Sequence, residues 1–175
     1  NPHSNNHTFG REVSEIVENS RLKVADLINA EPNEIIFTSG ATESNNLAIK
    51  SIAQNYFNTD FQIITAKTEH KCVLESCHYL EEKKNKVHYL DVNEDGLIDL
   101  NSLEFLIKDK PSLISIMHAN NEIGVLQPLM KIGELCKKYN AIFHSDIAQS
   151  ISTTAVDVKS LNLHAASISG HKIYG

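Results

Sequence analysis

The 175-residue chain has no run of apolar residues long enough to span a membrane. It also has no basic stripe: 16 Lys and Arg stand against 22 Asp and Glu, for a net charge of −6, which argues against a nucleic-acid role. The polar N-terminus resembles neither a secretory signal nor a transit peptide, and it begins with Asn rather than Met. We therefore expect a fragment or processed product of a cytoplasmic protein, or of a mitochondrial matrix protein whose transit segment has been removed.

Cysteine is scarce, and no internal repeat or low-complexity linker divides the chain. The three cysteines, Cys72, Cys77 and Cys136, are an odd number without secretory context, which indicates reduced thiols. A hydrophobic fraction of 41% and a charged fraction of 22% are ordinary for a globular protein. The length and composition predict one domain with a sizeable core.

Short apolar runs alternate with helical patterns along the chain. The predicted strands lie at 35–37, 63–65, 87–92, 113–117, from 141 onward, and 165–168. The predicted helices lie at 11–28, from a Thr42 cap through 56, and at 73–83, 103–108 and 129–139. Strands separated by helices imply a mainly parallel sheet, and their consecutive apolar residues imply helices on both faces. We therefore predict a three-layer α/β fold whose ligand binds beyond the carboxyl ends of the strands.

The segment after the first predicted strand has the features of a phosphate site. It reads Thr38-Ser39-Gly40-Ala41-Thr42-Glu43, a glycine turn that leads into a helix N-terminus. Free backbone N–H groups and the helix dipole favour an anion there. Ala41 lets the backbone approach closely, and Thr42 adds a hydroxyl donor. The segment is neither a Walker loop nor a dinucleotide fingerprint, and an ordinary capped helix is the alternative when it is taken alone.

Other polar residues follow the second and fifth predicted strands. His70 could stack its imidazole on an aromatic ligand, although a lone His in a loop is usually only a surface or core residue. Asp146 could cap a turn, or it could hold a pyridine nitrogen in its protonated form, because an opposite charge favours the charged state. Gln149, three residues further on, could donate to a ring hydroxyl oxygen.

The sixth predicted strand runs into Ser169-Gly170-His171-Lys172. A lysine after a buried strand is often a surface residue, but these flanking residues are unusual for a plain surface turn. Ser169 and His171 can donate to a phosphate while Lys172 reaches an aldehyde. Together with the residues above, they complete the set that pyridoxal 5'-phosphate (PLP) needs: a phosphate cradle, a ring stacker, partners for the ring nitrogen and hydroxyl, and an aldehyde lysine.

Five long motifs carry a family resemblance over essentially the whole chain. They are Ile-Ile-Phe-Thr-Ser-Gly-Ala-Thr-Glu-Ser-Asn-Asn, Thr-Glu-His-Lys-Cys-Val, Asn-Asn-Glu-Ile-Gly-Val, His-Ser-Asp-Ile-Ala-Gln and Ser-Ile-Ser-Gly-His-Lys-Ile-Tyr-Gly. The sequence resembles the cysteine desulfurases of iron–sulfur cluster assembly, which are fold-type I PLP enzymes of the class V aminotransferase superfamily. The resemblance implies a sulfurtransferase that converts L-cysteine to L-alanine and leaves a persulfide on an enzyme cysteine.

The resemblance also implies residue roles, a homodimer, and an iron–sulfur scaffold or other sulfur acceptor as partner. Cofactor-binding residues would be Ala41, Thr42, His70, Asn121, Asp146, Gln149, Ser169, His171 and Lys172. Asn121 would contact the cofactor and the substrate carboxylate. Lys172 and His70 would be catalytic, the lysine through the aldehyde and the histidine through proton transfer.

The chain also departs from the family pattern. Relatives are longer, so residues 1–175 are expected to form an incomplete PLP-binding large domain that lacks the C-terminal small domain, the sulfur-carrying cysteine and the substrate arginine. Ile147 stands where a small Ala is expected and would crowd the ring pocket. Cys77 and Cys136 are expected to be buried apolar residues. An uncovered sheet edge predicts poor solubility of the isolated monomer.

Three rival motifs are weaker. Residues 91–99 resemble the start of a calcium loop, but Ser102 stands where a bidentate Glu is needed. Cys72 and Cys77 are spaced so that they would not converge on a zinc ion, and no metal site is expected. Asn6-His7-Thr8 fits a glycosylation sequon that no secretory signal supports. The functional alternatives are another class V PLP reaction, such as selenocysteine cleavage, and a non-catalytic remnant.

Overall fold

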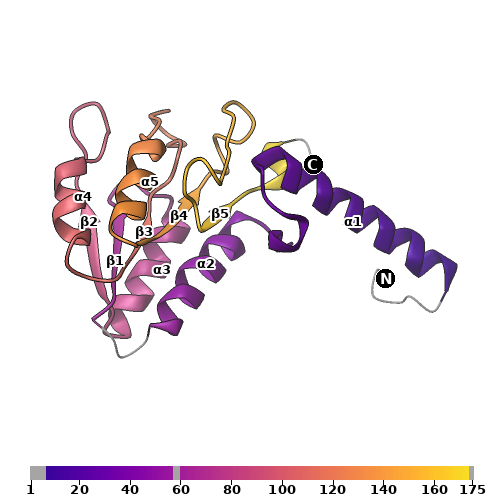
Figure 1. Ribbon diagram of the computed structural model, residues 1–175, viewed down its shortest axis with the longest axis horizontal. Helices are drawn as coiled ribbons and strands as arrows, with labels where there is room; N and C mark the ends of the chain where they lie inside the picture. The colour runs from indigo at the N-terminus through magenta and orange to yellow at the C-terminus, as the bar shows by residue number, and fades with distance from the viewer. Residues whose placement is uncertain (1–6, 57–59, 174–175) are drawn as a thin grey trace.

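The computed structural model describes residues 7–56 and 60–173. Within this part of the chain, parallel strands form one sheet in the order β2-β1-β3-β4-β5 (Figure 1). The strands are β1 (Gln62–Ala66), β2 (Lys86–Leu90), β3 (Ser112–Ser115), β4 (Ile142–Asp146) and β5 (Ala165–Ser167). The predicted parallel α/β fold is confirmed.

Helices connect the strands and flank the sheet. They are α1 (Thr8–Ile28), α2 (Ala41–Asn55), α3 (Lys71–Glu82), α4 (Leu100–Ile107) and α5 (Leu129–Lys138), with short 3-10 turns η1 (Pro32–Glu34) and η2 (Gly170–Lys172). Asp99 caps α4 by accepting from the backbone N–H groups of Asn101 and Ser102, so the calcium-like segment ends in a helix cap. The predicted helices at 11–28, 73–83, 103–108 and 129–139 correspond to α1, α3, α4 and α5.

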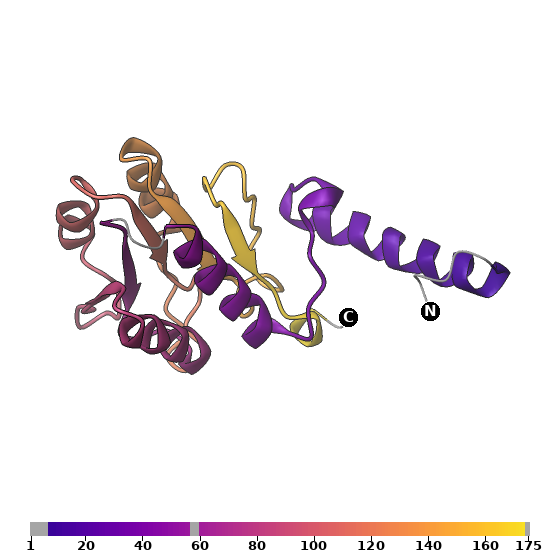
Figure 2. The same cartoon turned by 90° about the horizontal axis from the view of Figure 1, so that it is seen from below.

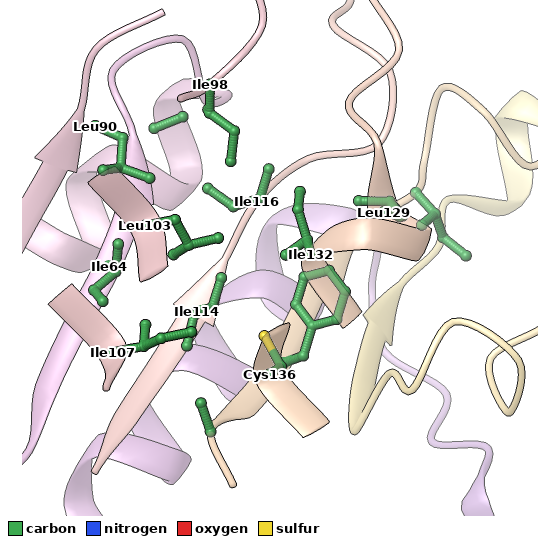
Figure 3. Close-up of a cluster of buried hydrophobic side chains, with 14 of the residues drawn as sticks. Ile64, Leu90, Ile98, Leu103, Ile107, Ile114, Ile116, Leu129, Ile132 and Cys136 are labelled. Carbon is green, nitrogen blue, oxygen red and sulfur yellow. The ribbon is translucent and has the colours of Figure 1, made fainter. Parts of the chain in front are cut away.

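The sheet is buried on both faces, and adjacent strand residues point to opposite sides. Ile63 packs in one apolar cluster with side chains of α2 and α3. Its neighbour Ile64 packs in a second cluster with α4 and α5, which Figure 3 shows in close-up. This alternation is the period of a β-strand. The predicted helices on both faces are therefore confirmed.

Two local predictions are wrong. Residues 35–37 belong to no strand of the described sheet, and Ile36 is 70% exposed. Arg21 of α1 donates to the carbonyl oxygen of Ile35 and lies over the Phe37 ring, so the segment is attached to a helix. Thr42 does not cap α2. The cap is Gly40, and Thr42 lies inside the first turn.

Helix α1 extends away from the sheet and contacts it only near its end (Figures 1 and 2). Ile28 packs into the cluster of α4 and α5, and its carbonyl oxygen accepts from the Val158 N–H at 3.0 Å. No helix among the described residues is long and apolar enough to cross a membrane.

Candidate active site

The parallel strands bring distant residues to one edge of the sheet. Because every strand runs the same way, all of their carboxyl ends lie at that edge. His70 follows β1, Asn121 follows β3, Asp146 ends β4 and Ser169 follows β5. The edge therefore gathers residues that are far apart in the sequence.

Asp146 is a buried carboxylate held by two donors. Its Oδ2 accepts from Asn45 Nδ2 at 2.7 Å, and its Oδ1 accepts from the Ala148 N–H at 3.0 Å. The side chain is 7% exposed. Hydrogen bonds to a charged acceptor are stronger than neutral ones, so this carboxylate has a fixed direction.

A short chain of contacts links Asp146 to His70. Asn45 Nδ2 also lies 3.3 Å from Cys72 Sγ, which lies 3.0 Å from His70 Nδ1. His70 caps α3, because its Nδ1 accepts from the Cys72 N–H at 3.2 Å. Burial raises the pKa of the Cys72 thiol, and hydrogen bonds from Asn45 and Thr42 oppose that rise only in part. Cys72 is therefore a neutral thiol that connects the two site residues.

Glu69 is a second buried carboxyl at this edge, and the sequence did not identify it. Its Oε1 accepts from the Met117 N–H at 2.6 Å, whereas its Oε2 has no partner among the described residues. Burial raises the pKa of Glu69 well above its ordinary value, and the nearby charge of Asp146 adds to the rise. Both effects favour the protonated form of Glu69.

The start of α2 offers free donors for an anion. Gly40 has φ 151°, a backbone conformation suited to glycine, and no side chain of the described residues caps this helix. Ala41 and Thr42 form the first turn, where unsatisfied N–H groups point along the helix axis. The bond from Asn45 to Asp146 brings this turn to the carboxyl edge.

The segment after β5 contributes the other predicted phosphate residues. Ser169 is buried, and its hydroxyl lies 2.9 Å from Nδ1 of the exposed His171. Lys172 is exposed in η2, and its N–H donates to the Ser169 carbonyl oxygen at 3.1 Å. The Ile147 N–H donates to the Ser167 carbonyl oxygen at 3.0 Å and ties this strand end to Asp146.

Three of the predicted site residues make no hydrogen bond to the buried Asp146 carboxyl group within the described structure. In the described structure, Asn121 is exposed, Gln149 is half-buried in the turn after β4, and neither donates to Asp146. Lys172 likewise has no hydrogen bond to that carboxylate in the described residues. Their cofactor roles remain predictions.

Ile147 is fully buried in the cluster of α4 and α5, whereas Asp146 accepts from Asn45 of α2. Ile147 lies one residue beyond the end of β4. The predicted crowding of the ring pocket stays a prediction.

The other two cysteines are core residues, as predicted. Cys77 and Cys136 are both 0% exposed, and burial raises the pKa of each thiol to about 12. A thiol with such a pKa is a poor nucleophile near neutral pH.

Two places on the molecule can be compared as sites for a phosphorylated pyridine: the carboxyl edge of the sheet and a hollow near the C-terminal end of α1. The residues of the carboxyl edge suit this ligand better. That hollow, of about 170 Å³, is lined by Leu27 and residues 151–156 and contains no carboxylate or lysine. The carboxyl edge combines a buried carboxylate, a helix N-terminus without a side-chain cap and a lysine on the neighbouring strand end. These groups fit the ring nitrogen, phosphate and aldehyde of PLP.

The chain belongs to the aminotransferase class-V family, whose match covers residues 1–175. Among curated proteins it is 55% identical over 174 residues to the cysteine desulfurase IscS of Ehrlichia chaffeensis, covering 99% of this chain and 42% of that protein. It is 54% identical over 175 residues to the cysteine desulfurase IscS of Rickettsia africae, covering 100% of this chain and 43% of that protein. The chain therefore spans less than half the length of these relatives.

Solved structures also match the chain over nearly its whole length. A NifS-like protein matches with a TM-score of 0.95 and 40% identity over 100% of this chain and 48% of that one. A structure described as SspA in complex with cysteine matches with a TM-score of 0.92 and 40% identity over 97% of this chain and 49% of that one. The resemblance to cysteine desulfurases is confirmed, and enzymes of this class are PLP-dependent.

Proposed function

We propose that this chain forms the PLP-binding part of a cysteine desulfurase, with residues 1–175 as an incomplete large domain. The observation that carries the proposal is the buried Asp146 carboxylate at the carboxyl edge, fixed by two donors and flanked by the strand that leads to Lys172. The similarity to two cysteine desulfurases at 55% and 54% identity supports it.

Each predicted residue then has a defined task. The first turn of α2, at Ala41 and Thr42, holds the phosphate together with Ser169 and His171. His70 stacks on the ring and transfers protons, and Asn121 contacts the cofactor and the substrate carboxylate. Asp146 keeps the ring nitrogen protonated, Gln149 donates to the ring hydroxyl oxygen, and Lys172 binds the aldehyde. Bound PLP supplies an electron sink for carbanion chemistry.

The proposed substrate is L-cysteine, because one relative is a cysteine desulfurase and a similar solved structure is a complex with cysteine. The reaction breaks the Cβ–S bond of cysteine and forms an S–S bond to a thiol. The thiol proton balances the new Cβ–H bond of alanine. The chain's own cysteines are buried, so the acceptor thiol is another one.

Location and partners belong to the same proposal. Three free, buried cysteines are compatible with the reducing cytoplasm or mitochondrial matrix. A homodimer and a sulfur-accepting protein are the proposed partners.

The test is a titration of the purified chain with PLP, followed by L-cysteine and dithiothreitol as acceptor thiol. Uptake of PLP with a visible absorbance band and formation of alanine would support the proposal. PLP uptake without alanine would limit the function to cofactor binding. No saturable PLP uptake would contradict the proposal.

A further inference from the structure

Asn45 is a fully buried polar residue on a helix face that is otherwise apolar. It shares that face of α2 with Ile49 and Ala53, both of which are almost completely buried. A polar side chain in such a position is costly unless its groups are bonded. Its presence therefore needs an explanation beyond packing.

The bonds of Asn45 point to Asp146. Its Nδ2 donates to the carboxylate at 2.7 Å and lies 3.3 Å from Cys72 Sγ, which uses both amide hydrogens. Its Oδ1 has no partner among the described residues. A fold that leaves this oxygen unbonded while directing both N–H groups toward acceptors has oriented the amide for Asp146.

Glu69 gives a second reason why this orientation matters. It is 6% exposed, and its Oε2 also lacks a partner in the described structure. Asp146, in contrast, accepts from two donors, Asn45 Nδ2 and the Ala148 N–H. These two hydrogen bonds fix the direction of its carboxyl group.

We propose that Asn45 is a positioning residue for the cofactor, because its amide holds the Asp146 carboxylate in the direction that faces the pyridine nitrogen. This inference rests on the proposed function. Asn45 acts through Asp146 and does not itself touch the cofactor.

The test compares PLP binding by the full chain and by three variants. Asn45→Ala removes the amide, and Asn45→Asp keeps its size but replaces the donors with a second carboxylate. Asn46→Ala is the matched control, because within the described residues the neighbouring Asn46 donates to the Thr42 carbonyl oxygen of its own helix and not to Asp146. The readouts are PLP affinity by absorbance titration and the pH midpoint of the visible band of the bound cofactor.

We expect Asn45→Ala and Asn45→Asp to weaken PLP binding at least tenfold and to shift the pH midpoint, while Asn46→Ala matches the wild type. A purely structural role would change the folded fraction, measured by circular dichroism, but not the spectrum of cofactor bound to folded protein. Wild-type affinity and midpoint in both Asn45 variants would overturn the inference and leave the proposed function standing. Absence of PLP binding by the wild type would overturn both.

Discussion

At the scale of single residues, the candidate site contains two buried carboxyl groups in different environments. Asp146 accepts hydrogen bonds from two donors. Glu69 accepts from one donor, and its Oε2 has no hydrogen-bond partner among the described residues. Two nearby carboxyls resist simultaneous ionisation, and burial raises the pKa of Glu69. Both effects therefore favour the protonated form of Glu69.

The raised pKa of Glu69 predicts a pH dependence of the free energy of unfolding. Its pKa is raised in the folded state, so the folded protein binds more protons than the unfolded chain above the ordinary value of 4.5. This contribution is fully present below pH 4.5 and is lost as pH rises through the folded pKa. Glu69→Gln replaces the carboxyl group with an amide that does not titrate. The variant should therefore not lose this stability as the pH rises.

Urea unfolding at a series of pH values checks the prediction. The variant should lie within about 1 kcal/mol of the wild type in acid and become relatively more stable toward neutral pH. Glu134→Gln, on the exposed side of α5, is the control and should follow the wild type. Parallel curves for Glu69→Gln and the wild type would contradict a raised pKa of Glu69 in the folded protein.

The sequence predicted the site residues at the strand ends but not the buried residues Asn45 and Glu69. Asp146 and Lys172 were predicted because polar residues after parallel strands meet at one edge. Asn45 lies in a quoted motif, and its spacing from Ile49 and Ala53 was a signal that a polar residue sits on the buried face. Glu69 gave no such signal, because its burial depends on the neighbouring strand that supplies the Met117 N–H.

Three buried side chains across the sheet were also not predictable. His144 Nδ1 lies 2.9 Å from Ser115 Oγ, and its Nε2 lies 3.0 Å from Ser167 Oγ. Burial lowers the pKa of His144 to about 4, so the imidazole is neutral. This ladder depends on the register of β3, β4 and β5, which local sequence patterns do not encode.

At the scale of elements, α5 approaches the loop that precedes β5 very closely at Gly133. A Cβ at this position would lie 2.0 Å from the Leu161 carbonyl oxygen. The contact is with backbone, so the neighbour cannot rotate away as a flexible side chain could. Gly133 is therefore required for the packing of this helix.

Gly133→Ala should destabilise the protein by about 1–3 kcal/mol through overpacking, although Ala alone favours a helix by about 1 kcal/mol. Urea unfolding measures the difference. Glu134→Ala, at the next position and exposed, is the control and should change stability by less than about 0.5 kcal/mol. An unchanged or higher stability of Gly133→Ala would show that the helix can move away from Leu161.

The wrong strand and the wrong cap have one physical cause. An apolar triplet at 35–37 has strand propensity, but a strand also needs a hydrogen-bonding neighbour, and Arg21 takes the Ile35 carbonyl oxygen instead. Thr42 has the preferred side chain for a cap, but the chain turns at Gly40, where φ is 151°. In both places, three-dimensional context overrode a local preference.

At the scale of the whole molecule, the alternation of strands and helices was sufficient to predict the layers. It did not predict how far α1 extends from them (Figure 2). Phe9, Val13, Ile16 and Leu27 lie on one side of this helix by their spacing and are 77%, 38%, 64% and 48% exposed. An exposed apolar stripe of this kind favours association.

We expect the chain to self-associate through this stripe, in line with the predicted poor solubility. Replacing both Phe9 and Ile16 with Gln should raise the dissociation constant at least tenfold, because each buried side chain contributes about 1.5–3 kcal/mol. Sedimentation velocity over a concentration series measures this. Phe105→Gln, a 70% exposed aromatic on α4, is the control. Equal effects of the control and the α1 substitutions would contradict the prediction.

PLP is proposed to bind at the carboxyl edge with its aldehyde on Lys172. Borohydride reduction of the PLP-treated chain, followed by peptide mass spectrometry, tests this binding mode. We predict a pyridoxyl label on the peptide that contains Lys172, and loss of that label in Lys172→Ala and Asp146→Ala. A label spread evenly over exposed lysines such as Lys71 and Lys159, or full labelling of Lys172 in Asp146→Ala, would contradict this binding mode.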